Sequence, residues 1–245
     1  MKDKFFKYIV PASIWILVWQ LVASFLKQEI LLVSPVCVVL TLGNLIQQAS
    51  FWQSIINSLL HIGLGFIIAL LASSVCAILS SLFKFIEYLL YPLVVTIKSV
   101  PIVSFIILIL VWVKPNNLSI IISFLMVFPL VYINILEGIK SSDIKLLEMA
   151  QVFNLSFLQR VTYIYIPEVL PYFKSACSMG LGLCWKAGIA AEVIALPSLT
   201  IGSSLYDSKI YFDIPELFAW TLVIIIISIF FEKMFKKILS LAFDR

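Results

Sequence analysis

The sequence contains little charge and few of the side chains that catalysis or metal binding requires. Only 12% of its 245 residues are charged, against about 25% in an ordinary soluble domain. His61 is the single histidine, and no nucleophilic side chain lies near it in a polar segment, which disfavours hydrolytic chemistry. No C-x-x-C pair occurs, so we predict neither a disulfide nor a metal site from the four cysteines, Cys37, Cys76, Cys177 and Cys184.

The chain also lacks a phosphate-binding loop. No segment has the form G-x-x-x-x-G-K-[ST], and the eight glycines lie mostly within apolar runs, so we expect no ATP and no other cofactor on this chain. Its formal net charge of +4 comes from basic residues that flank apolar runs and not from a basic cluster. We therefore expect no nucleic-acid partner.

Long apolar runs make up most of the sequence, in which 62% of the residues are hydrophobic. A bilayer core about 30 Å thick requires roughly 20 consecutive apolar residues per helical span. We therefore predict an all-α, polytopic membrane protein of a single domain, residues 1–245, with six transmembrane helices at residues 6–26, 55–82, 88–113, 119–138, 172–196 and 215–239. The first run lacks a cleavage site, which favours a retained helix. We assign residues 27–54 to the outer surface, with an interfacial helix.

Basic residues are distributed unevenly between the two ends of these predicted spans. With a cytoplasmic N-terminus, the inner flanks hold Lys2, Lys4, Lys7, Lys84, Lys140, Lys145, Arg160, Lys174, Lys233, Lys236, Lys237 and Arg245, and the outer loops hold only Lys27, Lys114 and Lys209. This asymmetry follows the positive-inside rule. It predicts that both termini and the polar segment 140–171 are cytoplasmic.

Two predicted spans carry small residues at every fourth position, which lets helices approach closely in lipid. These are Gly65, Ala69, Ser73 and Ala77 in the second span, and Ala176, Gly180, Cys184 and Gly188 in the fifth. We interpret both stripes as contacts within one bundle, the alternative being a subunit interface. In the third span, Pro92 and Pro101 each remove a backbone donor and predict a kink.

The polar segment 140–171 has the pattern of a helical hairpin. Ser142 or Asp143 can cap a first helix, in which Leu146, Leu147, Ala150 and Phe153 share one face. Asn154 readily adopts the left-handed conformation that ends a helix. Ser156 and Gln159 have the spacing of a capping box, which predicts a second helix running to Pro167. Such a hairpin either docks a partner or packs against the ends of the spans.

The same segment resembles the EAA loop of binding-protein-dependent ABC importer permeases. The matching positions are Glu148-Met149-Ala150, Asn154 six residues after the glutamate, and Ile166-Pro167. Met149 stands where the family usually has Ala, and Asn154 where it usually has Gly, although both Asn and Gly tolerate a left-handed turn. Further segments resemble the nitrate, taurine and aliphatic sulfonate branch, namely Leu32-Val33-Ser34-Pro35, Lys98-Ser99-Val100-Pro101, Trp185-Lys186-Ala187-Gly188, Ala191-Glu192, Ile201-Gly202 and Tyr211-Phe212-Asp213.

The resemblance implies the type I ABC importer permease fold, a bacterial inner-membrane location and a set of partners. These are two copies of a cytoplasmic ABC ATPase that holds ATP and Mg, a second copy of the permease, and an external substrate-binding protein, in a surrounding of membrane lipid. It also implies that the first hairpin helix couples to the ATPase, with Leu147 and Phe153 inserted into it. The coupling residues carried over are Leu147, Glu148, Ala150, Phe153, Asn154 and Pro167.

Three charged residues, Lys98, Lys186 and Glu192, fall within predicted spans. An unpaired charge there costs at least about 2.5 kcal/mol, so all three should face the interior. Two interpretations stay open. Either charges pair between spans, for example Lys98 with Glu192, or the lysines give the pathway a positive potential suited to an anion.

The substrate is not determined by these features. The branch favours an organic or inorganic anion such as a sulfonate, taurine or nitrate, with a non-anionic molecule such as a vitamin precursor as the alternative. A secondary transporter would be expected to show inverted repeats, and none is evident. An intramembrane enzyme is disfavoured because no catalytic cluster is present.

Overall fold

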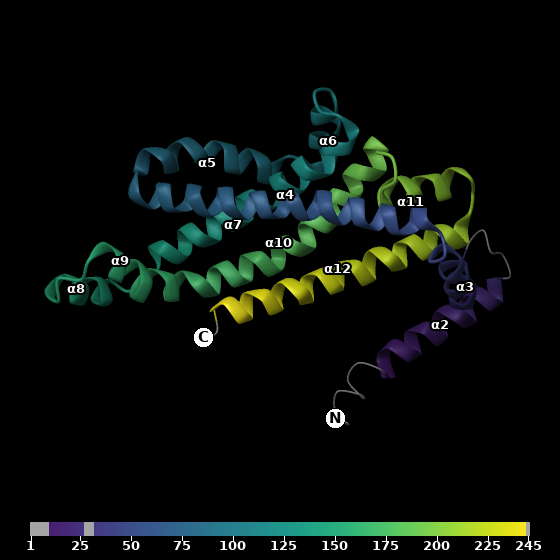
Figure 1. The fold of residues 1–245 in the computed structure, drawn as a ribbon, viewed down its shortest axis with the longest axis horizontal. Coiled ribbons are helices and arrows are strands. Elements are labelled where there is room, and N and C mark those ends of the chain that lie inside the picture. Colours follow the sequence, from purple (N-terminus) through teal and green to yellow (C-terminus); the bar gives the residue numbers. More distant parts are fainter. Residues whose placement is uncertain (1–9, 27–31, 244–245) are drawn as a thin grey trace.

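The computed structural model describes residues 10–26 and 32–243, and every regular element in these ranges is helical. Three long helices form the centre, α4 (Ala49–Leu82), α7 (Pro115–Lys140) and α10 (Ile166–Ala195). α7 packs extensively against both α4 and α10 (Figure 1). A fourth long helix, α12 (Ile214–Phe243), packs against α10. The predicted all-α class is confirmed.

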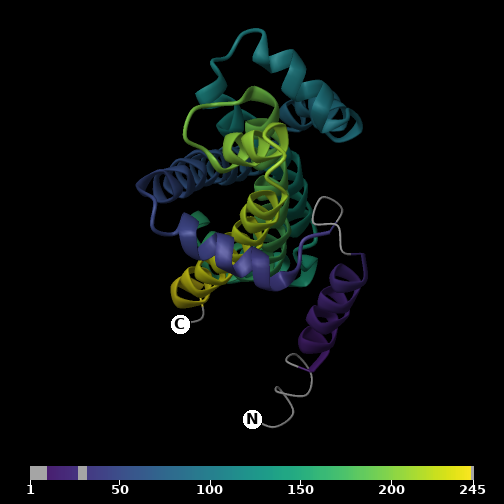
Figure 2. The ribbon, with the colours of Figure 1, turned by 90° about the vertical axis from the view of Figure 1, so that its right-hand side faces the viewer.

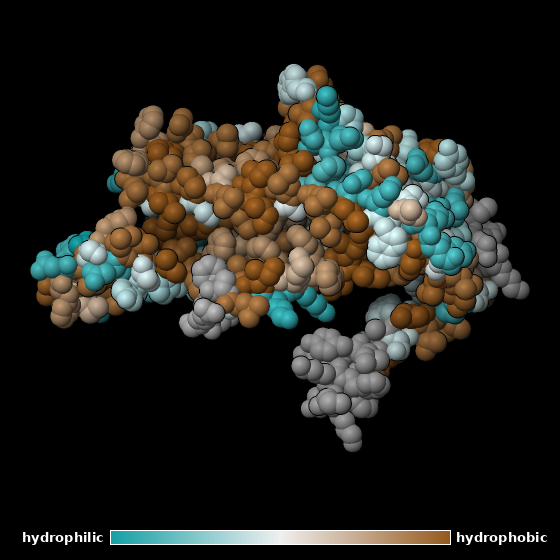
Figure 3. All heavy atoms as spheres, viewed as in Figure 1, coloured by the Kyte–Doolittle hydropathy of each residue, from teal (hydrophilic) through white to brown (hydrophobic). Residues whose placement is uncertain are grey.

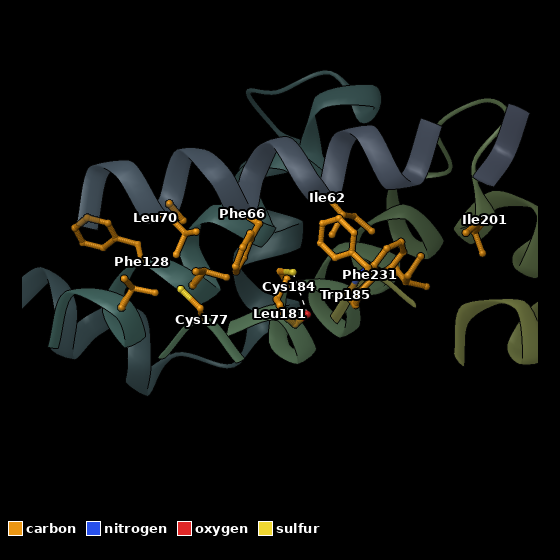
Figure 4. Packing of buried hydrophobic residues seen from close by; sticks show 14 of the residues in the cluster. Ile62, Phe66, Leu70, Phe128, Cys177, Leu181, Cys184, Trp185, Ile201 and Phe231 are labelled. Carbon is orange, nitrogen blue, oxygen red and sulfur yellow. Dashed lines mark hydrogen bonds between the residues drawn. The ribbon is translucent and has the colours of Figure 1, made fainter. Parts of the chain in front are cut away.

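The core lies where these four helices meet, as Figure 4 shows. Phe66 of α4, Leu181 and Trp185 of α10, and Phe231 of α12 are all buried there. The ring centroids of Trp185 and Phe231 are 5.9 Å apart with an edge-to-face geometry, an arrangement that aromatic pairs favour.

The small-residue stripes bring the central helices together. A Cβ added to Gly188 would lie 2.5 Å from Ile62 Cγ1 and 2.8 Å from Ser123 Oγ, so only glycine permits this approach of α10 to α4 and α7. On α4, Gly65 lies in the same way against the backbone of Ile120 and the side chain of Ser123. The interpretation of both stripes as contacts within one bundle is confirmed.

The number of helices that could cross a membrane is smaller than predicted. Among the described residues four helices are long and apolar enough, at Ala49–Leu82, Pro115–Lys140, Phe157–Ala195 and Ile214–Leu241, or five if a bent pair is counted as one span. The first predicted span is only partly described, because residues 6–9 lie outside the described ranges. Its described part is α2 (Val10–Leu26), which has 17 residues.

The prediction that residues 88–113 form one kinked helix, the third span, is wrong. This segment consists of α5 (Lys84–Ser99) and α6 (Ile102–Leu110), which meet at 104°. The break falls at Val100, whose extended backbone (φ −82°, ψ 132°) is the conformation imposed on a residue before proline. Pro101 thus ends α5 outright, whereas Pro92 lies inside it.

The fifth predicted span begins too late, and the hairpin does not end at Pro167. The second hairpin helix, α9 (Phe157–Arg160), continues through a π-helical turn, η2 (Val161–Tyr165), directly into α10. The result is one 39-residue helix, Phe157–Ala195. Pro167 lies in the first turn of α10. The backbone hydrogen bond that proline cannot donate is a small loss there, because the π-helical turn before it already departs from the α-helical hydrogen-bond pattern.

Short helices gather at the end of the bundle opposite the hairpin (Figure 1). α3 (Pro35–Leu45) is the helix expected within residues 27–54, and Ser34 caps it by accepting a hydrogen bond from Cys37 N at 3.3 Å. α11 (Ile201–Ile210) lies between α10 and α12 in the chain and packs against both. α2 stands apart from the central helices, as Figure 2 shows, and is tied on by a 2.9 Å hydrogen bond from Trp19 Nε1 to the Val33 carbonyl.

The face shown in Figure 3 is largely apolar along the bundle and more polar toward its two ends. Polar groups collect around the hairpin at one end, and around the segments next to α11 at the other. Of the basic residues that predict orientation, Lys2, Lys4, Lys7, Lys27 and Arg245 lie outside the described ranges.

Candidate functional site

The hairpin begins with α8 (Ile144–Val152), a helix capped at both ends by local hydrogen bonds. Asp143 is the N-cap, and its Oδ1 accepts a hydrogen bond from Lys145 N at 2.9 Å. At the other end Asn154 has a positive φ of 48°. Leu155 N donates to the Ala150 carbonyl at 2.9 Å and Asn154 N to the Gln151 carbonyl at 3.0 Å. This pair of bonds is a Schellman motif, so the predicted turn at Asn154 is confirmed.

The second helix starts with the predicted capping box. Ser156 N donates to Gln159 Oε1 at 2.8 Å, and Gln159 N donates to Ser156 Oγ at 3.4 Å. Arg160 adds a bond from its Nε to the Leu155 carbonyl at 3.0 Å, which ties the second helix back to the turn. Because each of these hydrogen bonds joins residues no more than five apart, the hairpin's shape is specified locally.

The structure places the predicted coupling residues at different depths. Ala150 is fully buried inside the hairpin and Leu147 is half-buried. Phe153 is 71% exposed at the tip, and Glu148 and Asn154 are exposed as well. The face predicted to carry Leu147 and Phe153 together therefore turns partly inward, and of these two side chains only Phe153 is exposed.

Sequence reasoning missed three further apolar side chains that the hairpin exposes. Val152 is 77% exposed, and Ile144 and Leu158 are similarly open. Val152 and Phe153 are consecutive at the end of α8, and Leu158 follows just beyond the turn. The sequence contained one signal for Val152. This residue lies off the predicted apolar face of the helix, where an apolar side chain has no packing role, so its exposure could have been predicted.

A second polar site lies buried near the opposite end of the long helix. Glu192 of α10 is fully buried, and its Oε2 accepts hydrogen bonds from Ser58 Oγ of α4 at 2.7 Å and from Gly202 N of α11 at 3.1 Å. Ser58 Oγ also accepts a hydrogen bond from Ile201 N at 2.9 Å. This buried cluster, defined as Ser58, Glu192, Ile201 and Gly202, joins three helices through one carboxyl oxygen.

Two features of α11 make this contact possible. A Cβ added to Gly202 would lie 2.7 Å from Val193 N and closer still to Glu192 Cβ, so glycine is required where α11 meets α10. Thr200 caps α11 with its own capping box to Ser203. The Glu192 carboxyl thus faces the first free N–H groups of a helix, where negative charge is favoured.

The predicted pairing of Lys98 with Glu192 is wrong. No ion pair joins Glu192 to a cation in the described part of the chain, and its Oε1 has no hydrogen-bond partner there. Lys98 is exposed on α5. Lys186 is exposed on α10, on a face where a Cβ added to Gly182 would meet no atom within 4 Å. A backbone N–H and a hydroxyl take the place of the expected ammonium group.

Within residues 10–26 and 32–243, no three His, Cys, Asp or Glu side chains come together as metal ligands. The described residues form an apolar helical bundle with a locally capped hairpin at one end and a buried polar cluster near the other.

Comparison with known proteins identifies the family. Residues 69–234 match the family described as binding-protein-dependent transport system inner membrane component, and the chain belongs to this family. It is accordingly a multi-pass membrane protein of bacterial ABC importers, a transport subunit and not an enzyme, and it works with an ATPase and a binding protein.

Relatives agree with this assignment, and a solved structure shares the fold. The chain is 26% identical over 223 residues to the permease SsuC of Bacillus subtilis (strain 168), named for aliphatic sulfonates transport, with 90% of this chain and 80% of that one covered. It is 28% identical over 148 residues to the taurine transport system permease protein TauC of Escherichia coli (strain K12), covering 60% and 54%. The fold matches the crystal structure of an amino acid ABC transporter with histidines at a TM-score of 0.59, with 18% identity and 78% and 92% coverage.

Proposed function

We propose that this chain is a six-span permease that moves a small anion, such as a sulfonate, taurine or nitrate, and is driven through its hairpin by a separate ATPase. The observation that carries the proposal is the hairpin itself. Its backbone is closed by a Schellman motif and a capping box, and it exposes consecutive apolar side chains, Val152 and Phe153, beyond the end of the bundle. A rigid apolar tip of this kind suits insertion into a groove of a partner protein.

The proposed orientation has the hairpin and both termini in the cytoplasm. Lys84, Lys140, Lys145 and Arg160 all belong to the ends of helices near the hairpin, whereas Lys114 and Lys209 belong to the opposite end (Figure 1). This distribution follows the positive-inside rule. In this arrangement α2 belongs to the first of the six spans.

The proposed assembly contains two permeases and two ATPases. ATP and Mg bind the ATPases, because this sequence has no phosphate-binding loop. Gly182 and Lys186 support a second permease copy, since an exposed lysine within a span is costly against lipid and is better placed beside an aqueous path between subunits. There Lys186, with Lys98, would give the pathway a positive potential that favours anions. Glu192 is a structural residue in this proposal.

Coupling is tested by changing the hairpin tip without disturbing its fold. We expect Phe153→Asp to lower ATPase co-purification and transport at least tenfold, because burying a carboxylate in an apolar groove costs more than 1.4 kcal/mol, about a tenfold change. The matched control is Phe212→Asp, at a residue that is 79% exposed and belongs to the α11 end. Equal co-purification of the two variants would refute coupling through this tip.

The pathway and substrate are tested in proteoliposomes that contain the permease, ATPase and binding protein. Uptake of labelled taurine, an alkyl sulfonate, nitrate and a neutral thiamine precursor is compared for the wild type and for Lys186→Met. The proposal expects uptake of at least one anion and a raised KM in the variant. Uptake of the neutral compound alone, with unchanged kinetics in Lys186→Met, would favour the vitamin-precursor alternative.

A further inference from the structure

A cavity of about 460 Å³ lies between the hairpin and the central helices. Its walls come from the last turns of α4 and α7 and from the first turns of the long helix, so three candidate spans line it, and it is partly open at the surface. The side chains that define it include Ile78, Leu82, Ile135, Phe157, Val161 and Phe173. Its volume is within the range of about 300–1,000 Å³ typical of small-molecule sites.

The walls offer almost no free polar group. Ser74 and Ser81 line the cavity, but their hydroxyls donate to carbonyls of their own helix, Leu70 and Ile78, each at 2.7 Å. The other lining residues are apolar except for Tyr165. Water would find few partners here, so the stable occupant of this cavity is an apolar group.

Three cations adjoin lining residues of this cavity in the sequence. Lys84, Lys140 and Arg160 lie one or two residues from the lining residues Leu82, Ile139 and Val161. Lys140 is paired with Glu87 at 2.6 Å. Lys84 is exposed, and no ion pair or hydrogen bond of its side chain occurs in the described ranges. Arg160 uses its Nε for the Leu155 carbonyl and keeps its other donors available.

Two carboxylates nearby do not cancel this charge. Glu137 is two residues from both Ile135 and Ile139, which places it on the opposite side of α7, about 200° around the helix. Glu168 is half-buried in the first turn of α10, eight residues and so about 12 Å further along the helix than Arg160. Lys84 and Arg160 therefore remain as cations beside the lining residues that have no ion pair in the described ranges.

We propose that this cavity binds one acyl chain of an anionic phospholipid of the inner leaflet, with its phosphate held by Lys84 and Arg160. Basic pockets between membrane helices on the cytoplasmic side are suited to anionic headgroups. The bound chain would contact both Phe157 and the π-helical turn at Val161 and Tyr165, so it would brace the hairpin against α4 and α7. The placement at the inner leaflet rests on the orientation in the proposed function.

The test uses the assembled transporter purified in mild detergent and analysed by native mass spectrometry with phosphatidylglycerol or phosphatidylcholine added. We expect phosphatidylglycerol to be retained preferentially. Lys84→Gln and Arg160→Gln should each weaken its retention about fivefold, the factor corresponding to about 1 kcal/mol per basic residue near a membrane surface. The charge control is Lys209→Gln, in α11, which should have no effect.

Val161→Trp should fill the cavity and abolish retention, whereas Leu158→Trp, at an exposed residue of the same helix that does not line the cavity, should not. Because Val161→Trp can disturb folding, wild-type transporter is also labelled with a phosphatidylglycerol that carries a photoreactive acyl chain. Labelling within residues 74–82 and 157–173 supports the proposal. The proposal is overturned if labelling occurs only elsewhere in the chain. It is also overturned if both lipids are retained equally.

ATPase co-purification is measured on the same samples. Absence of specific lipid in a complex that assembles and hydrolyses ATP would refute the lipid site alone. Specific lipid on a chain that never retains the ATPase would leave the site intact and refute the proposed coupling.

Discussion

Replacing Gly202 with alanine tests whether α11 is held to α10 through the buried cluster. The added Cβ would lie 2.7 Å from Val193 N and 2.8 Å from the Glu192 carbonyl carbon, well inside the roughly 3.5–4.0 Å of ordinary contact. These neighbours are backbone atoms of a packed helix, so α11 has to move by about 1 Å. The bond from Gly202 N to Glu192 Oε2, now 3.1 Å, would then be lost.

The magnitude follows from three terms. Overpacking of this kind costs about 1–3 kcal/mol, and loss of a hydrogen bond to a buried carboxyl costs about 1.5–3 kcal/mol. The higher helix propensity of alanine returns about 1 kcal/mol. The net destabilisation is about 2–5 kcal/mol, which for a chain of this size lowers the thermal midpoint by about 4–20 °C.

The assay is thermal unfolding of the purified permease in detergent, followed by tryptophan fluorescence. The matched control is Gly43→Ala in α3, because a Cβ there meets nothing within 4 Å. Its thermal midpoint should stay the same or rise, since only the propensity term remains. If Gly202→Ala unfolds at the same temperature as Gly43→Ala, the close contact of α11 with α10 is not present in the folded protein.

Predictions at three further positions follow from the structure. Asn154→Gly should preserve the hairpin, whereas Asn154→Val should cost about 1–2 kcal/mol because its φ of 48° disfavours a β-branched residue; limited proteolysis within residues 140–160 would distinguish them. Gly188→Ala should lower the thermal midpoint, since its Cβ would lie 2.5 Å from Ile62 Cγ1 and overpacking costs about 1–3 kcal/mol; an unchanged midpoint would contradict the packing described. Ser58→Ala should cost about 1–3 kcal/mol by leaving Ile201 N without an acceptor, whereas the control Ser74→Ala removes only a bond within its own helix and should change the midpoint little.

The hairpin was predictable because its determinants are local. The turn at Asn154 and the helix start at Ser156 depend on hydrogen bonds between residues no more than five apart. An Asn at a helix end and a Ser followed three residues later by Gln are recognisable sequence patterns for these two features. The end of the second helix was not predictable in the same way. Pro167 signals a boundary in isolation, but the π-helical turn before it accommodates the missing N–H, and the helix continues.

The buried cluster could not be found from the sequence for the opposite reason. Ser58 and Glu192 are separated by 134 residues, and two of the donors are backbone N–H groups, which no residue type signals. Charge alone suggested Lys98 as the partner of Glu192, whereas a helix N-terminus and a hydroxyl supply the hydrogen bonds. Similarly, the composition of residues 88–113 indicated one span, and only the backbone restriction before Pro101 separates it into two helices.

The hairpin and the buried cluster lie at the two ends of one continuous helix, Phe157–Ala195, which can act as a lever between them. Its 39 residues extend about 58 Å at 1.5 Å per residue. Pivoting this rod by about 5° at the hairpin would displace its far end by about 5 Å, close to one helical turn. Glu192 lies at that far end. A small tilt produced by a partner docked at the hairpin would therefore displace Glu192 by several times as much relative to Ser58 and Gly202, to which it is hydrogen-bonded.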